Sequence, residues 1–263
     1  MEKSLKDIQS LEDHRGIAID RVGIRSLRSP IEFINQDSSV SSVATWTMTV
    51  SLSKEHKGTH MSRFVETLKA NYKFDIEGLI NFPQLLLEKI GGEHAYIKTE
   101  FPYFREKISP VSGQKSLLDY DISFEIEASK TQTDAILELH VPITTLCPCS
   151  KEISEYGAHN QRGFIRLAVR FDDILALNLN KFISELEELG SSQLYSLLKR
   201  VDEKFVTEQA YDNPGFVEDV IREVANYLNK NNTITWYSVE IENEESIHTH
   251  NAYAIIEKDK TIS

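Results

Sequence analysis

The order of the expected secondary-structure elements is the feature that most limits the fold of this chain. Each half shows strand-like runs, then segments with apolar residues at helical spacing, then further strand-like runs. The two halves share no visible sequence repeat, so a duplication of one module is inferred from the order of the elements alone. The sequence predicts an α+β fold of two modules, residues 1–130 and 131–263, each an antiparallel sheet with two helices on one face.

The individual elements follow from periodicity and from turn residues. Strands are expected in the segment up to Phe33 and over residues 40–52, 94–108, 120–128, 135–144, 163–171, 233–241 and 252–257. Helices are expected over residues 62–72, 75–90, 179–189 with a continuation through 194–206, and 215–229. Residues 109–115 are expected to form a turn, and residues 144–162 a loop. Edge strands left open in each module favour closure by a partner module or another subunit.

Composition limits the class of protein and its partners. With 40% hydrophobic and 27% charged residues, the chain can bury a full core. It has no apolar run near the ~18 residues needed for a membrane span, and its polar start lacks a signal-peptide core. The two cysteines, Cys147 and Cys149, are too close for an unstrained disulfide and fit a reducing compartment. We therefore expect a cytoplasmic protein without a membrane partner.

The formal charge of −12 argues against nucleic acid as a partner, because phosphate backbones require basic surface. It leaves room for a small phosphate ligand, which needs only a local cluster of donors.

Chemically versatile side chains are densest between Thr144 and Arg162, around Cys147 and His159. A thiolate and an imidazole are preferred ligands of metals such as Zn²⁺. Two cysteines cannot complete a common zinc finger, but histidines elsewhere could add ligands and leave an open position that suits catalysis. The alternative is that these are ordinary thiols and a surface histidine.

A second cluster near the C-terminus contains Glu242, Glu244, Glu245, His248 and His250. In an extended strand, the two histidines would share one face. The alternative is a solvated acidic loop.

A third cluster runs from His56 to Arg63, just before the helix predicted to begin near Ser62, and includes Lys57, His60, Ser62 and Arg63. Free backbone N–H groups, a hydroxyl and a guanidinium make such a helix start a good anion site. The alternative is simple capping of the helix by Thr59 or Ser62, with Arg63 solvated.

Two further carboxylates lie on predicted helices. Glu203 belongs to the charge-rich run Lys199–Gln209, for which a solvated helix face is the default interpretation. Glu218 lies in the first turn of the next helix, where a carboxylate stabilises the helix dipole even without another role.

Four stretches carry a resemblance to a known family: Lys57–Val65, Leu146–Gly163, Asp202–Val220 and Glu240–Ala254. The run CPCSKEISEYGAHNQR from Cys147 to Arg162 is the most specific. Together these stretches resemble the type IB GTP cyclohydrolases, a prokaryotic family that starts folate-type pterin synthesis. The resemblance implies tandem tunnelling-fold modules that pair across subunits into barrels, in a homotetramer.

The resemblance also implies a reaction: metal-dependent hydrolysis of GTP to 7,8-dihydroneopterin triphosphate and formate. By resemblance, Cys147 and His159 are catalytic and form the core of the metal site. Glu203, Glu245 and His248 are the remaining ligands or proton-transfer groups. The metal is a divalent Mn, Zn or Fe ion.

GTP itself requires two further groups of contacts. One carboxylate can accept both parallel donors of guanine, N1–H and the 2-amino group, and Glu218 is the expected anchor. His60, Ser62 and Arg63 are expected to bind the triphosphate. Two alternatives stay open: a nitrile reductase of the same fold with Cys147 as nucleophile, and a non-catalytic metal-binding protein. The role of Cys149 is also open.

Overall fold

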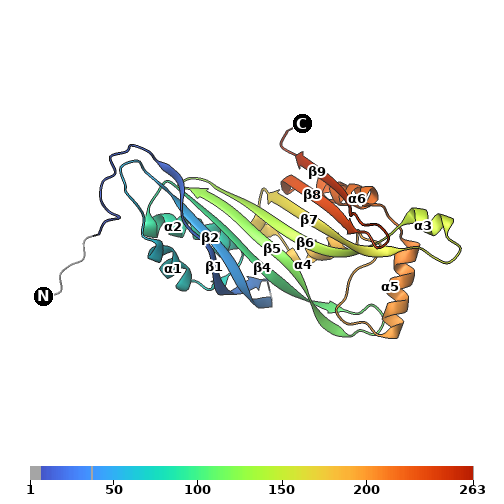
Figure 1. The fold of residues 1–263 in the computed structure, drawn as a ribbon. Coiled ribbons are helices and arrows are strands. Elements are labelled where there is room, and N and C mark those ends of the chain that lie inside the picture. The colour runs from blue at the N-terminus through green and yellow to red at the C-terminus, as the bar shows by residue number, and fades with distance from the viewer. Residues whose placement is uncertain (1–6, 37, 263) are drawn as a thin grey trace. The chain divides into compact units, whose positions relative to one another are not determined.

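The computed structural model describes residues 7–36 and 38–262. Over these residues it is an α+β structure with nine strands and six α-helices (Figure 1). The strands are β1 (Ile19–Asn35), β2 (Ser38–Leu52), β3 (Lys73–Phe74), β4 (His94–Ile108), β5 (Lys115–Ser129), β6 (Thr133–Leu146), β7 (Asn160–Phe171), β8 (Ile234–Glu244) and β9 (Ala252–Asp259). The helices are α1 (Met61–Lys69), α2 (Ile76–Ile90), α3 (Pro148–Ile153), α4 (Leu179–Glu187), α5 (Arg200–Asp212) and α6 (Val217–Lys230), with a short 3₁₀ helix at Ile174–Ala176.

The strands are hydrogen-bonded in the order β3-β1-β2-β4-β5-β6-β7-β8-β9. The short β3 pairs parallel with β1, whereas β1–β2, β2–β4, β6–β7, β7–β8 and β8–β9 are antiparallel. A mostly antiparallel sheet confirms the predicted α+β class.

The chain divides into two compact units. Unit 1 holds the described residues up to Phe101 together with Ser123–Ile136, and unit 2 holds Pro102–Ile122 together with the described residues from Leu137 onward. Strands β4, β5 and β6 contribute residues to both units. The predicted module boundary at residues 130/131 stays a prediction.

Unit 1 has an aromatic core between its sheet and its helices. Helix α1 packs on β1 and α2, and α2 packs on β2 and β3. The ring centroids of Trp46 and Phe82 both lie 5.3 Å from that of Phe74 and 5.8 Å from each other, and all three side chains are buried. Pro83 lies inside α2 without ending it.

In unit 2, helices α4 and α6 bury apolar side chains. The buried stripe of α6, which includes Val220, Val224 and Leu228, matches the predicted apolar spacing and packs toward β8 and β9. Phe216 falls within the helix expected over residues 215–229, but it precedes α6 as the N-cap residue and is 40% exposed.

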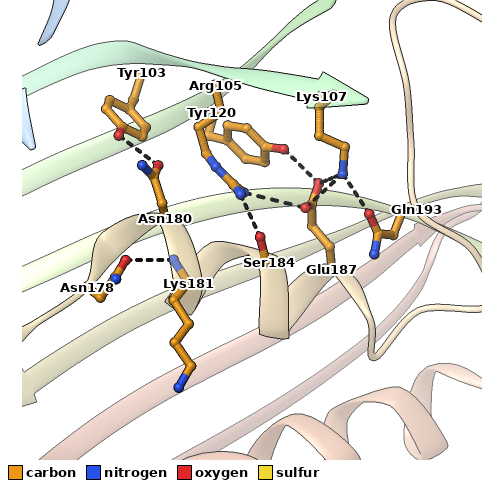
Figure 2. Close-up of polar contacts among 10 residues, drawn as sticks. All are labelled: Tyr103, Arg105, Lys107, Tyr120, Asn178, Asn180, Lys181, Ser184, Glu187 and Gln193. Carbon is orange, nitrogen blue, oxygen red and sulfur yellow. Dashed lines mark hydrogen bonds and ion pairs between the residues drawn. The ribbon is translucent and has the colours of Figure 1, made fainter. Parts of the chain in front are cut away.

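A buried charged cluster anchors α4 to the strands of unit 2 (Figure 2). The Glu187 carboxylate is 1% exposed and accepts hydrogen bonds from Lys107 Nζ at 2.9 Å and from the Tyr120 hydroxyl at 2.7 Å. Arg105 approaches the same carboxylate at 3.5 Å, and Gln193 accepts a further bond from Lys107 at 2.7 Å. Burial lowers the pKa of Lys107 and raises that of Tyr120.

Two expectations about local structure were wrong. The helix from residue 179 does not continue through 194–206, because α4 ends at Glu187 and α5 begins at Arg200. Residues 144–162 are not one loop: β6 extends to Leu146, α3 follows, and β7 begins at Asn160.

In the described residues, the structure has no helix that is both long and apolar enough to cross a membrane.

Candidate functional site

Three adjacent strands of unit 2 bring the first two predicted clusters together. Leu146, at the end of β6, pairs with Asn160 at the start of β7. Arg162 of β7 pairs with Glu244 at the end of β8. The residues just outside these strands, Cys147, His159 and Glu245, therefore lie at the same end of the sheet.

Cys147 is held by the start of the short helix α3. It is the N-cap residue, followed by Pro148, whose fixed φ suits the first helical position. Its half-buried Sγ accepts a hydrogen bond from the Ser150 N–H at 3.5 Å, and its own N–H donates to the His159 carbonyl at 3.1 Å. Cys149 lies in the same helix with an exposed side chain.

The polar contacts of the His159 ring are made at its Nδ1 atom. Its side chain is 14% exposed, and Nδ1 lies 3.0 Å from Gln161 Oε1. The Ser246 hydroxyl lies 3.4 Å from the same nitrogen, and Glu245 Oε2 lies 4.0 Å from it. Glu245 is itself only 11% exposed. The segments that carry a thiol, an imidazole and a carboxylate thus lie at the same end of the three strands.

The connection between β8 and β9 carries the two C-terminal histidines. At the point where this connection leaves β8, Glu242 accepts hydrogen bonds from Asn251 Nδ2 at 2.8 Å and from Arg166. These two bonds, the one from Asn251 foremost, hold the pKa of Glu242 below its usual value. His248 and His250 are exposed and lie in a loop, with stacked rings 5.1 Å apart.

The connection between α5 and α6 lies beside Cys147. The Gly215 N–H donates to the Leu146 carbonyl at 3.0 Å, and Lys151 Nζ of α3 donates to the Tyr211 carbonyl of α5. Glu218, in the first turn of α6, is exposed only three residues beyond Gly215. The start of α6 is therefore close to the backbone of the Cys147 segment.

The fifth predicted metal ligand, Glu203, lies elsewhere on the same helix pair. It is exposed in the first turn of α5, at the opposite end of that helix from Tyr211. Among the residues that the structure describes, no three His, Cys, Asp or Glu side chains are grouped closely enough to hold a metal ion. The five-residue ligand set therefore stays a prediction.

The residues predicted for the triphosphate belong to unit 1. His60 is the N-cap residue of α1, Ser62 and Arg63 are exposed in its first turn, and His60 and Arg63 line a cavity of about 460 Å³. His60 Nε2 lies 3.2 Å from Asp7 Oδ2. A hydrogen bond from the Ser10 hydroxyl is the main reason that the pKa of Asp7 is lowered.

The capping alternative for this segment was wrong. No side-chain capping bond forms at the start of α1, so neither Thr59 nor Ser62 has that function. Among the described residues, the N-cap His60 offers no side-chain acceptor to the backbone N–H groups of this helix start.

Sequence reasoning did not assign a role to Gln161 or Thr145. Both are buried, and Gln161 Nε2 donates to Thr145 Oγ1 at 3.0 Å while its oxygen faces His159. The alternation of a strand that begins at Asn160 would have indicated that Gln161 points inward. The predicted strand began three residues too late for this signal to be used.

Comparison with known proteins identifies the chain. Residues 5–254 match the family model of the type I GTP cyclohydrolase folE2. The chain belongs to this family. Its sequence is 46% identical to the GTP cyclohydrolase FolE2 of Methylobacillus flagellatus over 258 aligned residues. This aligned region covers 97% of this chain and 96% of the relative. The chain is 48% identical over 255 residues to the GTP cyclohydrolase FolE2 of Syntrophus aciditrophicus, which covers 96% and 99%.

A search of solved structures finds urate oxidase from Bacillus subtilis 168, with a TM-score of 0.47 and 7% identity over 92% of this chain and 100% of that one. The uricase of Arthrobacter globiformis has the same TM-score and identity, over 91% and 92%.

Membership of the family confirms the predicted resemblance and the predicted function, a GTP cyclohydrolase I of tetrahydrofolate or pterin biosynthesis. It decides against the nitrile reductase and the non-catalytic metal-binding protein as the function of this chain.

Proposed function

We propose that this chain hydrolyses GTP to 7,8-dihydroneopterin triphosphate and formate at the joined ends of β6, β7 and β8, with Cys147 and His159 as its catalytic residues. The observation that carries the proposal is the gathering of Cys147, His159 and Glu245 at one end of three adjacent strands. Reactive side chains at the ends of rigid elements are the usual arrangement for a site.

The residue types at this position are those that a divalent transition metal prefers as ligands. Cys147 supplies a half-buried thiol, His159 an imidazole with Nδ1 already engaged, and Glu245 a largely buried carboxylate. We propose Glu203 and His248 as the other ligands or as proton-transfer groups, and Mn, Zn or Fe as the metal. When bound, such an ion supplies a Lewis acid that makes water nucleophilic at neutral pH.

The chain's own side chains would bind and orient the base. Glu218 is exposed close to the Cys147 segment, and its carboxylate can accept both N1–H and the 2-amino group of guanine. Adenine lacks this pair of donors, so ATP would leave the carboxylate without partners. An acid among the predicted proton-transfer groups must also protonate the imidazole nitrogens as the five-membered ring opens.

The triphosphate would bind at the start of α1. Within the described residues, its N-cap side chain makes no capping bond to these N–H groups, and His60, Ser62 and Arg63 add donors beside the 460 Å³ cavity. An anion there would compete with Asp7 for His60.

We further propose a homotetramer whose tunnelling-fold modules pair into barrels, and a cytoplasmic location. The outer strand β9 supports association, because Tyr253 and Ile255 are more than half exposed on a strand that ends the sheet. Two free thiols fit a reducing compartment.

The test is incubation of the purified protein with GTP in the presence of Mn²⁺, Zn²⁺ or Fe²⁺, each in turn. We expect formate and a pterin that becomes fluorescent after oxidation, and no product from ATP. Absence of both products with all three metals would refute the proposed reaction.

A further inference from the structure

A buried hydrogen-bonded chain leads from strand β6 to the imidazole of His159. Thr145 and Gln161 are directly paired across β6 and β7, and they are 0% and 8% exposed. Gln161 Nε2 donates to Thr145 Oγ1 at 3.0 Å, and Gln161 Oε1 lies 3.0 Å from His159 Nδ1. A neutral imidazole carries its proton on one nitrogen only, so this contact bears on which nitrogen is protonated.

The surroundings of Nδ1 determine the direction of that hydrogen bond. Glu245 Oε2 lies 4.0 Å from Nδ1, and a carboxylate on this side of the ring favours a proton there. With Nδ1–H as donor, Gln161 must turn its oxygen to the ring and its amide N–H to Thr145, which is the arrangement observed. Within the described residues, no side chain or backbone group is hydrogen-bonded to Nε2 of His159.

We propose that Gln161, held by Thr145, is a positioning residue that keeps the proton of His159 on Nδ1 and leaves Nε2 as the metal-binding nitrogen. The ligand role of His159 rests on the function proposed above, whereas the tautomer does not. An amide oxygen that fixes the tautomer of a ligating histidine also orients the ring, and loss of such a partner typically weakens metal binding.

The first experiment observes the tautomer without metal or substrate. The eight histidines are labelled with ¹⁵N in their rings, and the His159 signals are assigned by their absence in His159→Asn. In metal-free wild-type protein at a pH where the ring is neutral, we expect Nδ1 to be protonated and Nε2 to be unprotonated. A proton on Nε2 would overturn the proposal.

The second experiment compares variants in the same spectrum and in Zn²⁺ binding. Gln161→Met keeps the side-chain length but removes the amide, and we expect mixed tautomers and Zn²⁺ binding weaker by about 10- to 100-fold. Gln161→Glu keeps an oxygen acceptor toward the ring, and we expect it to retain the Nδ1–H tautomer. Thr145→Val removes the hydroxyl that holds the Gln161 amide in place. If Gln161→Met does not fold, Thr145→Val takes its place in the same two measurements.

Gln84→Met is the matched control, because Gln84 is a part-buried glutamine of unit 1 that donates to the Ser129 carbonyl. It should leave the tautomer and the Zn²⁺ affinity unchanged.

Zn²⁺ affinity is measured by competition with a chromophoric chelator, without turnover. An unchanged tautomer and affinity in both Gln161→Met and Thr145→Val would refute the positioning role. A different outcome is that wild-type protein binds no Zn²⁺ but has the Nδ1–H tautomer, and Gln161→Met loses that tautomer. The proposed metal site would then be refuted, whereas the role of Gln161 in setting the tautomer would be supported.

Discussion

At the scale of single residues, the two cysteines provide the sharpest contrast. Cys147 is half-buried and bonded to the His159 segment, whereas Cys149 is exposed. Cys147 is proposed above as a metal ligand, and a bound metal supplies several kcal/mol of transition-state stabilisation, so we expect Cys147→Ala to lower kcat/KM by at least about 100-fold. Cys149→Ala should keep part of the activity and serves as the matched control. Equal formate production by wild type and Cys147→Ala would contradict the role of Cys147.

Glu218 provides a second test at this scale. Gln in its place keeps the shape but offers a single neutral acceptor to guanine, so we expect GTP binding to weaken by roughly 10- to 100-fold, the range for a lost charged hydrogen bond. Zn²⁺ affinity should change little. Glu223→Gln, an exposed carboxylate on the same helix, is the control. The measurement is calorimetric titration with GTP, and unchanged affinity in Glu218→Gln would count against the anchor.

Residue-scale prediction from the sequence is possible where a motif carries the information. Cys147 and His159 were predicted to act together; strand pairing brings their segments together, and their shared chemical role stays a prediction. The hydrogen bonds that orient His159 could not be predicted, because they depend on the register of β6 against β7. The distribution of the predicted ligands, with Glu203 at the far end of α5, likewise depends on tertiary structure.

At the scale of elements, periodicity predicted the longer strands and helix α6, but it missed the short strand β3, the short helix α3 and the break after α4. Long-range contacts fix that break. The Ser191 N–H donates to the Thr144 carbonyl at 2.8 Å, and the Thr144 N–H donates to Ser192 at 3.0 Å. A Cβ at Gly190 would come within 2.8 Å of Ile143, so the chain passes close to β6 there. The helical spacing of residues 194–206 carries no signal of these contacts.

The attachment of α4 to the strands of unit 2 gives a stability prediction. Glu187 is the buried carboxylate that compensates Lys107, and Glu187→Gln would leave a buried ammonium without its counter-charge. We expect the free energy of unfolding to fall by about 3–5 kcal/mol, the usual cost of breaking a buried ion pair. Glu188→Gln changes the exposed neighbour and should stay within about 0.5 kcal/mol of wild type. Urea unfolding at one fixed protein concentration measures both, and similar midpoints would show that the pair contributes little.

At the scale of the whole molecule, the residues proposed to bind GTP are divided between the two units. His60, Ser62 and Arg63 belong to unit 1, whereas Cys147, His159 and Glu218 belong to unit 2. In the homotetramer proposed above, symmetry repeats each interface, so that unit 1 of one subunit and unit 2 of another would be able to serve the same site. Light scattering of a homotetramer of this 30.1 kDa chain should give about 120 kDa.

Subunit mixing tests whether the site is shared. Arg63→Ala removes a proposed triphosphate contact in unit 1, and Cys147→Ala removes the thiol in unit 2, so each variant alone should be nearly inactive. If one subunit supplies Arg63 and its neighbour supplies Cys147, random co-assembly of the two variants leaves about a quarter of the sites with both residues intact. We therefore expect co-expression, followed by purification of assemblies that carry two different tags, to restore formate production from GTP. Co-expression of Arg63→Ala with Glu66→Ala, another unit 1 variant with an exposed side chain outside the proposed site, controls for the effect of mixing itself. Mixed assemblies as inactive as the parent variants would mean that both residues act within one chain, and the shared site would have to be abandoned.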